Sequence, residues 1–251
     1  MRKLLTAGCV LMCAAAAWAT PSTQIWIPST DIQPFGVPHL GFDTYFRASE
    51  HGYFVPGQRD PNVYDAGVTI GVLPFHDVQM EVGVDYLSTF SGLPTDDHPV
   101  FFNAKIGIPE GVLFTNSPAL AVGGCNFGTK RHNTARTDQD MVYGLASKVL
   151  PPVGRLSAGY YVGNDDLLVD RGGRDQSRGV LLSWDRTMAE IDDRLWMAVD
   201  YQGGDNALGA LSFGAAWAFT PRVSVILGYD IWNQKAVAGA NTVTLQLDVN
   251  L

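Results

Sequence analysis

The C-terminal stretch Asn241-Thr-Val-Thr-Leu-Gln-Leu-Asp-Val-Asn-Leu251 decides the fold. Every second residue from Val243 to Leu251 is apolar, and the residues between them are polar. Side chains of a β-strand point alternately to its two faces, so this stretch predicts a strand with one apolar and one polar face.

The same alternation recurs along the chain. Counting the C-terminal stretch, it predicts twelve strands, at residues 38–47, 63–73, 78–87, 100–108, 118–127, 140–150, 155–163, 177–185, 193–202, 207–219, 222–232 and 241–251. The segments are about ten residues long, which is the length that a tilted strand needs to cross a bilayer. Strands of soluble proteins are typically shorter, at about five or six residues.

The charged side chains favour a membrane barrel over a soluble sandwich, because they fall on one face in strand after strand. A wet interior explains this face, while the uncharged face meets lipid. We therefore expect the following charged residues to line the lumen: Asp43, Arg47, Asp65, Glu81, Asp85, Lys105, Lys148, Asp185, Arg194, Asp200, Arg222 and Asp230.

Aromatic residues near the ends of the apolar faces support the same interpretation. Membrane barrels carry such residues as girdles at the two water interfaces. The predicted lipid-facing girdle consists of Tyr86, Phe102, Trp184, Trp217, Phe219 and Tyr229.

The connections between the strands alternate in length. With the N-terminus in the periplasm, the outer loops are 48–62, 88–99, 128–139, 164–176, 203–206 and 233–240. The inner turns are 74–77, 109–117, 151–154, 186–192 and 220–221, and they are mostly shorter. Residues 203–206, Gly-Gly-Asp-Asn, read as a tight hairpin. The sequence thus predicts an all-β fold, a closed antiparallel up-and-down transmembrane β-barrel of about twelve strands.

The first residues predict export. Met1-Arg2-Lys3 precedes an apolar run from Leu4 to Trp18, and Ala17-Trp18-Ala19 provides a small-x-small cleavage site. This is the pattern of a secretory signal peptide. We expect a signal peptide at 1–19 with cleavage after Ala19, an N-terminal segment at 20–36 and a transmembrane barrel at 37–251. Three interpretations of 20–36 stay open: a short extra strand, a periplasmic lead or a segment inside the lumen.

Two resemblances follow from these residues. The last strand, ending at Leu251, resembles the terminal strand of bacterial outer-membrane barrels, although those usually end in an aromatic residue. This resemblance implies the bacterial outer membrane as location, lipid and lipopolysaccharide as surroundings, and contact of the C-terminal strand with the barrel-assembly machinery. The opening Ile25-Trp26-Ile27-Pro28-Ser29-Thr30, followed by Gly36-Val37-Pro38-His39-Leu40-Gly41, resembles barrel proteins linked to exopolysaccharide export.

Charge and cysteine content exclude several classes. The chain carries 17 Lys and Arg against 25 Asp and Glu, a formal net charge of −8. An acidic chain is not expected to bind nucleic acid, which requires clustered basic side chains. Cys125 is the cysteine left after cleavage, so no internal disulfide is expected. The basic run Lys130-Arg131-His132, with Arg136, could touch lipopolysaccharide phosphates, but an exposed charge run more often only solvates a loop.

The candidate catalytic and metal-binding residues give weak patterns. The five histidines, His39, His51, His76, His98 and His132, lie mostly in predicted loops without a paired serine and carboxylate. Asp96-Asp97-His98 and the group Asp165, Asp166, Asp170 and Asp175 lack the spacing of a calcium loop. We therefore expect no enzyme, no cofactor and no metal; a lipid-modifying outer-membrane enzyme is a distant third interpretation.

The lumen charges are the strongest functional signal. Acidic residues outnumber basic ones there, which predicts a small porin-like channel for ions or polar solutes with weak cation preference. Small inward residues favour an open lumen: Gly67, Gly71, Gly83, Gly107, Gly144, Ala146, Gly159, Ala210, Ser212 and Gly214. The alternative is a non-conducting accessory barrel in envelope structure or exopolysaccharide export. A barrel of twelve strands lies between the filled and the open sizes.

Overall fold

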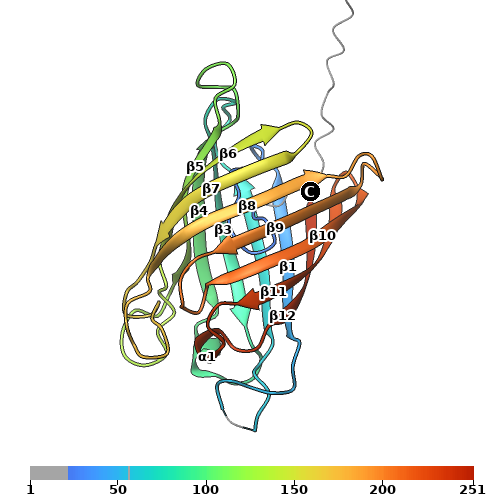
Figure 1. The fold of residues 1–251 in the computed structure, drawn as a ribbon. Coiled ribbons are helices and arrows are strands. Elements are labelled where there is room, and N and C mark those ends of the chain that lie inside the picture. The colour runs from blue at the N-terminus through green and yellow to red at the C-terminus, as the bar shows by residue number, and fades with distance from the viewer. Residues whose placement is uncertain (1–21, 56) are drawn as a thin grey trace, which may run out of the picture.

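In the computed structural model, which describes residues 22–55 and 57–251, twelve strands form one closed antiparallel barrel (Figure 1). The predicted signal peptide at 1–19 and its cleavage after Ala19 lie outside the described residues. The strands are β1 (Pro38–Arg47), β2 (Val63–Gly71), β3 (Gln79–Ser88), β4 (Val100–Ile108), β5 (Ala119–Gly128), β6 (Met141–Leu150), β7 (Gly154–Val162), β8 (Arg178–Thr187), β9 (Leu195–Gln202), β10 (Ala210–Thr220), β11 (Val223–Trp232) and β12 (Thr242–Asn250).

Each strand pairs with its neighbours in the sequence, and β12 closes the ring by pairing with β1. Phe42 on β1, for example, lies opposite Leu247 on β12 and Ala66 on β2. Closure pairs the backbone groups of every strand on both sides, as a bilayer requires. The predicted fold is therefore confirmed.

Two short helical turns lie in the connections, η1 (Pro94–Asp97) and α1 (Lys235–Ala238). Among residues 22–55 and 57–251, no helix is long and apolar enough to cross a membrane.

The outer surface of the barrel is apolar. Val122 on β5 and Leu227 on β11 are 57% and 60% exposed, although a water-soluble protein would bury such side chains. The six aromatic residues predicted as a girdle also point outward. Trp184, Trp217 and Phe219 lie towards the end with the short turns, and Tyr86, Phe102 and Tyr229 lie towards the end with the long loops. An apolar exterior on a closed barrel is the architecture that spans an outer membrane.

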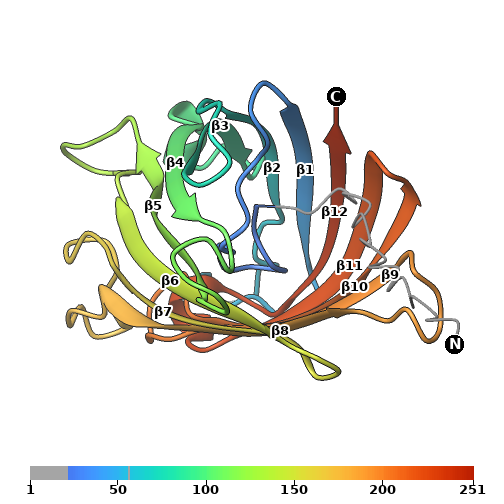
Figure 2. The ribbon, with the colours of Figure 1, turned by 90° about the horizontal axis from the view of Figure 1, so that it is seen from above.

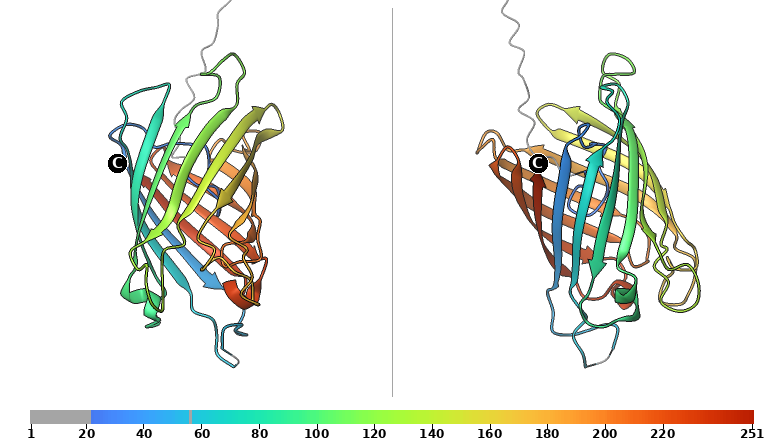
Figure 3. Two further views of the ribbon diagram at one scale, coloured as in Figure 1. Left: turned by 90° about the vertical axis from the view of Figure 1, so that its left-hand side faces the viewer. Right: turned by 180° about the vertical axis from the view of Figure 1, so that it is seen from behind.

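The two ends of the barrel differ (Figures 1 and 3). The start of β1 and the end of β12 meet at the end with the shorter turns, where His39 pairs with Asn250. The opposite end carries η1, α1 and most of the long loops. The tight hairpin predicted at 203–206 is wrong in extent, because β10 begins only at Ala210. Asn206 shapes the longer connection by accepting hydrogen bonds from the backbone N–H groups of Leu208 and Gly209.

The N-terminal segment lies inside the barrel, as the view along the barrel shows (Figure 2). Residues 22–29 fold back on themselves: the backbone N–H of Ser29 donates to Ser22 O at 3.0 Å, and that of Gln24 donates to Ile27 O at 2.7 Å. We call residues 22–29 the N-terminal hairpin. Ile25 and Ile27 at its tip are 1% and 0% exposed. Residues 30–37 then lead to β1.

On β6 the inner and outer faces are the reverse of the prediction. On β6, Tyr143 and Leu145 face inward and are buried. Gly144, Ala146 and Lys148 therefore face outward, and a Cβ added at Gly144 would meet no atom within 4 Å. Their assignment to the lumen was wrong because it equated the polar or small face with the inside. On β6 the inside is apolar because it contacts the hairpin.

Candidate functional site

The N-terminal hairpin crosses the lumen between strands on nearly opposite sides of the ring. At its base, Lys105 on β4 donates to Ser22 O at 2.6 Å and to Ser29 O at 3.2 Å. At its tip, the Asp200 carboxylate on β9 accepts hydrogen bonds from the backbone N–H groups of Ile25 and Trp26. Both ends of the hairpin are thus fixed to the wall by charged side chains, which make stronger hydrogen bonds than neutral ones.

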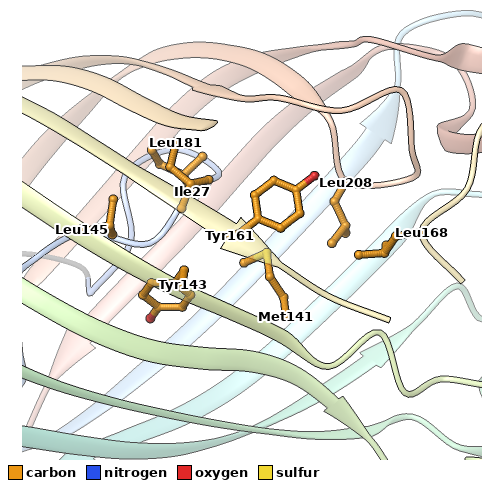
Figure 4. Packing of buried hydrophobic residues seen from close by; sticks show 8 residues of the cluster. All are labelled: Ile27, Met141, Tyr143, Leu145, Tyr161, Leu168, Leu181 and Leu208. Carbon is orange, nitrogen blue, oxygen red and sulfur yellow. The ribbon is translucent and has the colours of Figure 1, made fainter. Parts of the chain in front are cut away.

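Apolar contacts complete the docking of the hairpin tip. Ile27 packs beside Leu181 within a cluster that also holds Leu145 and Tyr161 (Figure 4). On the other side of the tip, Ile25 packs against residues of β9, β10 and β11: Ala198, Gly214, Ala216, Ile226 and Gly228. Gly214, which we took as a sign of open space, therefore makes room for the N-terminal segment, as do Gly71 beside Pro34 and Gly107 beside Ile32.

Side chains on the surrounding strands also bind Gln24 in the hairpin and Asp31 and Gln33, which follow it. Arg155 on β7 bridges Asp31, at 2.6 Å, and Asp185 on β8, at 2.8 Å. Gln24 donates to the same Asp185 carboxylate, and the backbone N–H of Gln33 donates to Glu81 at 2.7 Å. Arg155 was not among the residues predicted for the lumen, although every-second-residue spacing puts it on the same face of β7 as Ser157 and Gly159.

A cavity of about 530 Å³ remains in the lumen beside the hairpin. Its wall comes mainly from β1 to β6, with single residues of β9 and β11 and two residues of β12. The residues that matter below are Trp26 on the hairpin and Asp43, Tyr45, Asp65, Asp85 and Trp232 on the strands. A cavity of this volume is large enough for a small molecule.

Nine of the twelve charged residues predicted for the lumen lie on the inner face: Asp43, Arg47, Asp65, Glu81, Asp85, Lys105, Asp185, Asp200 and Asp230. The structure brings the first six together around the cavity. Asp185 and Asp200 instead hold the hairpin, and Asp230 accepts a hydrogen bond from Thr242 at 2.7 Å.

The other three lie elsewhere, and their placement in the lumen was wrong. Lys148 is on the outer face near the end of β6, where it pairs with Glu110 at 2.6 Å. Arg194 precedes β9 and pairs with Asp192 at 2.8 Å, and Arg222 precedes β11 in an exposed turn. Strand ends carry such charges because the side chains there reach water.

The loop carboxylates considered as metal ligands bind protein groups. The Asp96 carboxylate accepts hydrogen bonds from Thr89 and Ser88, which offset its burial and lower its pKa. Asp170 binds Arg174, and Asp166 binds Arg136 at 2.7 Å. Within the described residues, no group of three or more His, Cys, Asp or Glu could hold a metal ion.

His39 is the histidine with the closest carboxylate neighbour among the described residues, and it is buried. It faces inward on β1, with Nε2 at 3.3 Å from Asp248 and Nδ1 at 3.1 Å from Asn250. The nearby Ser224 hydroxyl donates to Asp248 at 3.4 Å. A nucleophilic serine needs a base to take its proton, and here the serine bonds to the carboxylate rather than to the imidazole. We therefore assign this group to the wall of the lumen.

Comparison with known proteins shows which class of structure the fold resembles. A scan against protein-family models and a search of curated proteins gave no match. An outer membrane channel from Pseudomonas putida F1 is similar in structure, with a TM-score of 0.52 at 13% identity, covering 88% of this chain and 97% of that one. The NanC porin gives a TM-score of 0.45 at 12% identity, covering 84% of this chain and 98% of that one. The chain thus has the fold of an outer-membrane β-barrel, shared with the Pseudomonas channel.

Proposed function

We propose that the protein is a small outer-membrane channel for ions or polar solutes, with weak cation preference and with the N-terminal hairpin as its constriction. The observation that carries this proposal is the cavity beside the hairpin, whose wall presents Asp43, Asp65 and Asp85. Carboxylates that line a narrow, low-dielectric passage raise the local concentration of cations. The Pseudomonas channel of similar fold supports the same class of function.

The test is recording from the purified chain in planar lipid bilayers. We expect a small conductance. In a KCl gradient, its reversal potential should be shifted towards the equilibrium potential of K⁺. Deletion of residues 22–29 is expected to raise the conductance severalfold, because the hairpin crosses the lumen. Substitution of Arg174, which is exposed in an outer loop, provides the control. Folded protein that does not conduct, with or without the hairpin, would overturn the proposal.

The alternative is a non-conducting accessory barrel in envelope structure or polysaccharide export. The observation that favours it is the hairpin itself, which is anchored at both its base and its tip. Conductance that appears only in the deletion variant would support this alternative. Loss of surface polysaccharide or of envelope integrity in a deletion strain would then show the role.

The proposal includes the surroundings of the barrel. The long loops face outward towards lipopolysaccharide, the girdle aromatics contact lipid headgroups, and the C-terminal strand β12 is the part that the barrel-assembly machinery binds. It assigns no catalytic role. Fractionation of the envelope, followed by protease treatment of whole cells, tests the location and the orientation together, because only outward loops would be cleaved.

A further inference from the structure

The basic side chains that line the cavity are all engaged by protein groups. Lys105 pairs with Glu81 at 3.2 Å and donates to two carbonyl oxygens of the hairpin. Arg47 donates to Pro61 O at 2.9 Å and to Ala240 O at 2.7 Å. His39 and Arg136 are paired with carboxylates as well. The positive charges around the cavity therefore do not remain available to neutralise further carboxylates.

Three acidic side chains at the cavity have no such partner. Asp43 lies directly opposite Asp65 in the β1–β2 pairing, and Asp85 follows on β3. Within the described residues none of the three is in an ion pair, and Oδ1 of Asp65 is buried without a hydrogen-bond partner. Asp85 accepts one hydrogen bond, from Asn103 at 2.7 Å. Carboxylates held together in this way repel one another, and a cation between them relieves that repulsion.

Aromatic side chains continue the wall of the same cavity, from Tyr45, which lies two residues from Asp43 on β1, towards the end with the long loops. The Trp26 ring meets Tyr45 at 5.4 Å and Trp232 at 4.9 Å between centroids, both edge to face. Trp232 lines the cavity and is 7% exposed, yet its indole N–H has no hydrogen-bond partner among the described residues. A buried donor is normally satisfied, so this N–H is free to donate to an acceptor on a ligand in the cavity. Aromatic rings also attract organic cations.

From these observations we infer that the cavity is a binding site for a small organic ammonium ion that carries a hydroxyl group. The carboxylates of Asp43, Asp65 and Asp85 hold the cationic end, and the aromatic side chains of Tyr45, Trp26 and Trp232 enclose its alkyl groups. The Trp232 indole N–H donates to the hydroxyl oxygen. The inference names the class of solute that the channel proposed above would carry. The biological role of the site therefore rests on that proposal.

Binding of choline to the full mature chain in detergent, measured by isothermal titration calorimetry, tests the site. Its uncharged isostere 3,3-dimethylbutan-1-ol tests the role of charge, and tetramethylammonium tests the role of the hydroxyl group. We expect choline to bind at least tenfold more tightly than the isostere and several times more tightly than tetramethylammonium. Equal binding of choline and the isostere, or no choline binding at millimolar concentration, would overturn the inference.

Two variants and two matched controls locate the site. Asp65→Asn is expected to weaken choline binding at least tenfold, whereas Asp170→Asn in an outer loop should not. Trp232→Phe is expected to reduce choline affinity to that of tetramethylammonium, whereas Trp217→Phe on the outer face should leave it unchanged. Heat-modifiable migration on gels shows whether each variant is folded. If Asp65→Asn and Trp232→Phe are folded and bind choline normally, the site is not in this cavity.

The binding measurement needs no ion flow, so its outcome is separate from that of the channel proposal. Choline binding by a barrel that does not conduct would support the binding site and overturn the channel proposal. Conductance without choline binding, and without block of the current by choline, would support the channel proposal and overturn the binding site.

Discussion

The carboxylate of Asp200 on β9 accepts a hydrogen bond of 2.8 Å from the backbone N–H of Ile25, 175 residues earlier in the chain. The same carboxylate oxygen accepts a second bond from Trp26 at 3.0 Å. Because Asp200 is only 1% exposed, water does not compete for these bonds. The contact fixes the tip of the N-terminal hairpin against the wall that faces its base at Lys105.

Substitution of this acceptor is therefore expected to loosen the hairpin. Asp200→Ala leaves the buried N–H of Ile25 and the partly buried N–H of Trp26 without this acceptor, at a cost of about 1–3 kcal/mol for a fully buried group. We expect amide hydrogen exchange of residues 24–27 to accelerate by more than tenfold in detergent micelles, while exchange in the β12 strand stays slow. Asp192→Ala, in an exposed turn, is the control. Unchanged protection of residues 24–27 would show that the tip of the hairpin is held by apolar packing without the Asp200 bonds.

The contact between Ile25 and Gly228 gives a second prediction. A Cβ added at Gly228 would lie 2.9 Å from Ile25 Cγ2 and 2.9 Å from Thr244 Cγ2. Since the strands are fixed by hydrogen bonds on both sides, Ile25 has to give way. Gly228→Ala should destabilise the docked hairpin by about 1–3 kcal/mol, as overpacking does.

A double-mutant cycle checks this cause. Ile25→Ala removes the Cγ2 methyl, so the cost of Gly228→Ala should fall in that background. The free energies of unfolding, measured in urea, should be non-additive by more than about 0.5 kcal/mol, as is usual for residues in contact. Strict additivity would mean that Gly228→Ala acts on the strand rather than on the hairpin.

The barrel could be predicted because its signal is local and repeated. Alternation such as that in residues 241–251 reports which face of a strand meets lipid, and the same rule applies around the whole ring. Strand ends were less well defined: β10 begins at Ala210 rather than at residue 207 because Asn206 organises the preceding loop. Arg194 and Arg222 were misplaced for the same reason, since the alternation was extended into turns.

The interior was harder to predict because it depends on contacts between distant residues. Ile25 and Ile27 are visible as an apolar pair, but nothing local states what they pack against. Once they occupy the lumen, the inner face of β6 has to be apolar, so Tyr143 and Leu145 point inward and Gly144 points outward. Asp65 and Asp85 were assigned correctly to the inner face, yet their lack of basic partners became visible only in three dimensions.

The turn before β9 yields a prediction on pH. The hydrogen bond from Arg194 to Asp192 lowers the pKa of this carboxyl from 3.8 to about 2. A carboxyl with a lowered pKa in the folded state stabilises the turn fully above its ordinary pKa, and this contribution is lost as pH falls towards about 2.

Carbon-13 NMR of the Asp192 carboxyl in micelles measures this pKa directly. The midpoint is expected at about 2, and in Arg194→Gln it should rise towards the ordinary value of 3.8. The folded barrel should persist in both proteins, because the strands themselves are untouched. A midpoint that does not respond to the substitution would assign the shift to the backbone N–H of Arg194 instead.

The lipid-facing surface gives the last prediction, at Leu227. This residue lies in the middle of β11, points outward and is 60% exposed, whereas its neighbour Ile226 points inward and is 0% exposed. An arginine at the bilayer midplane costs about 2–4 kcal/mol, because hydrocarbon does not solvate its charge. Leu227→Arg should therefore lower the free energy of unfolding from phospholipid vesicles by about this amount. Ile191→Arg is the matched control, since Ile191 is 68% exposed in a turn outside the strands and should tolerate the charge. Equal effects of the two substitutions would mean that the outer face of β11 meets water, and the membrane-spanning arrangement of the barrel would then be wrong.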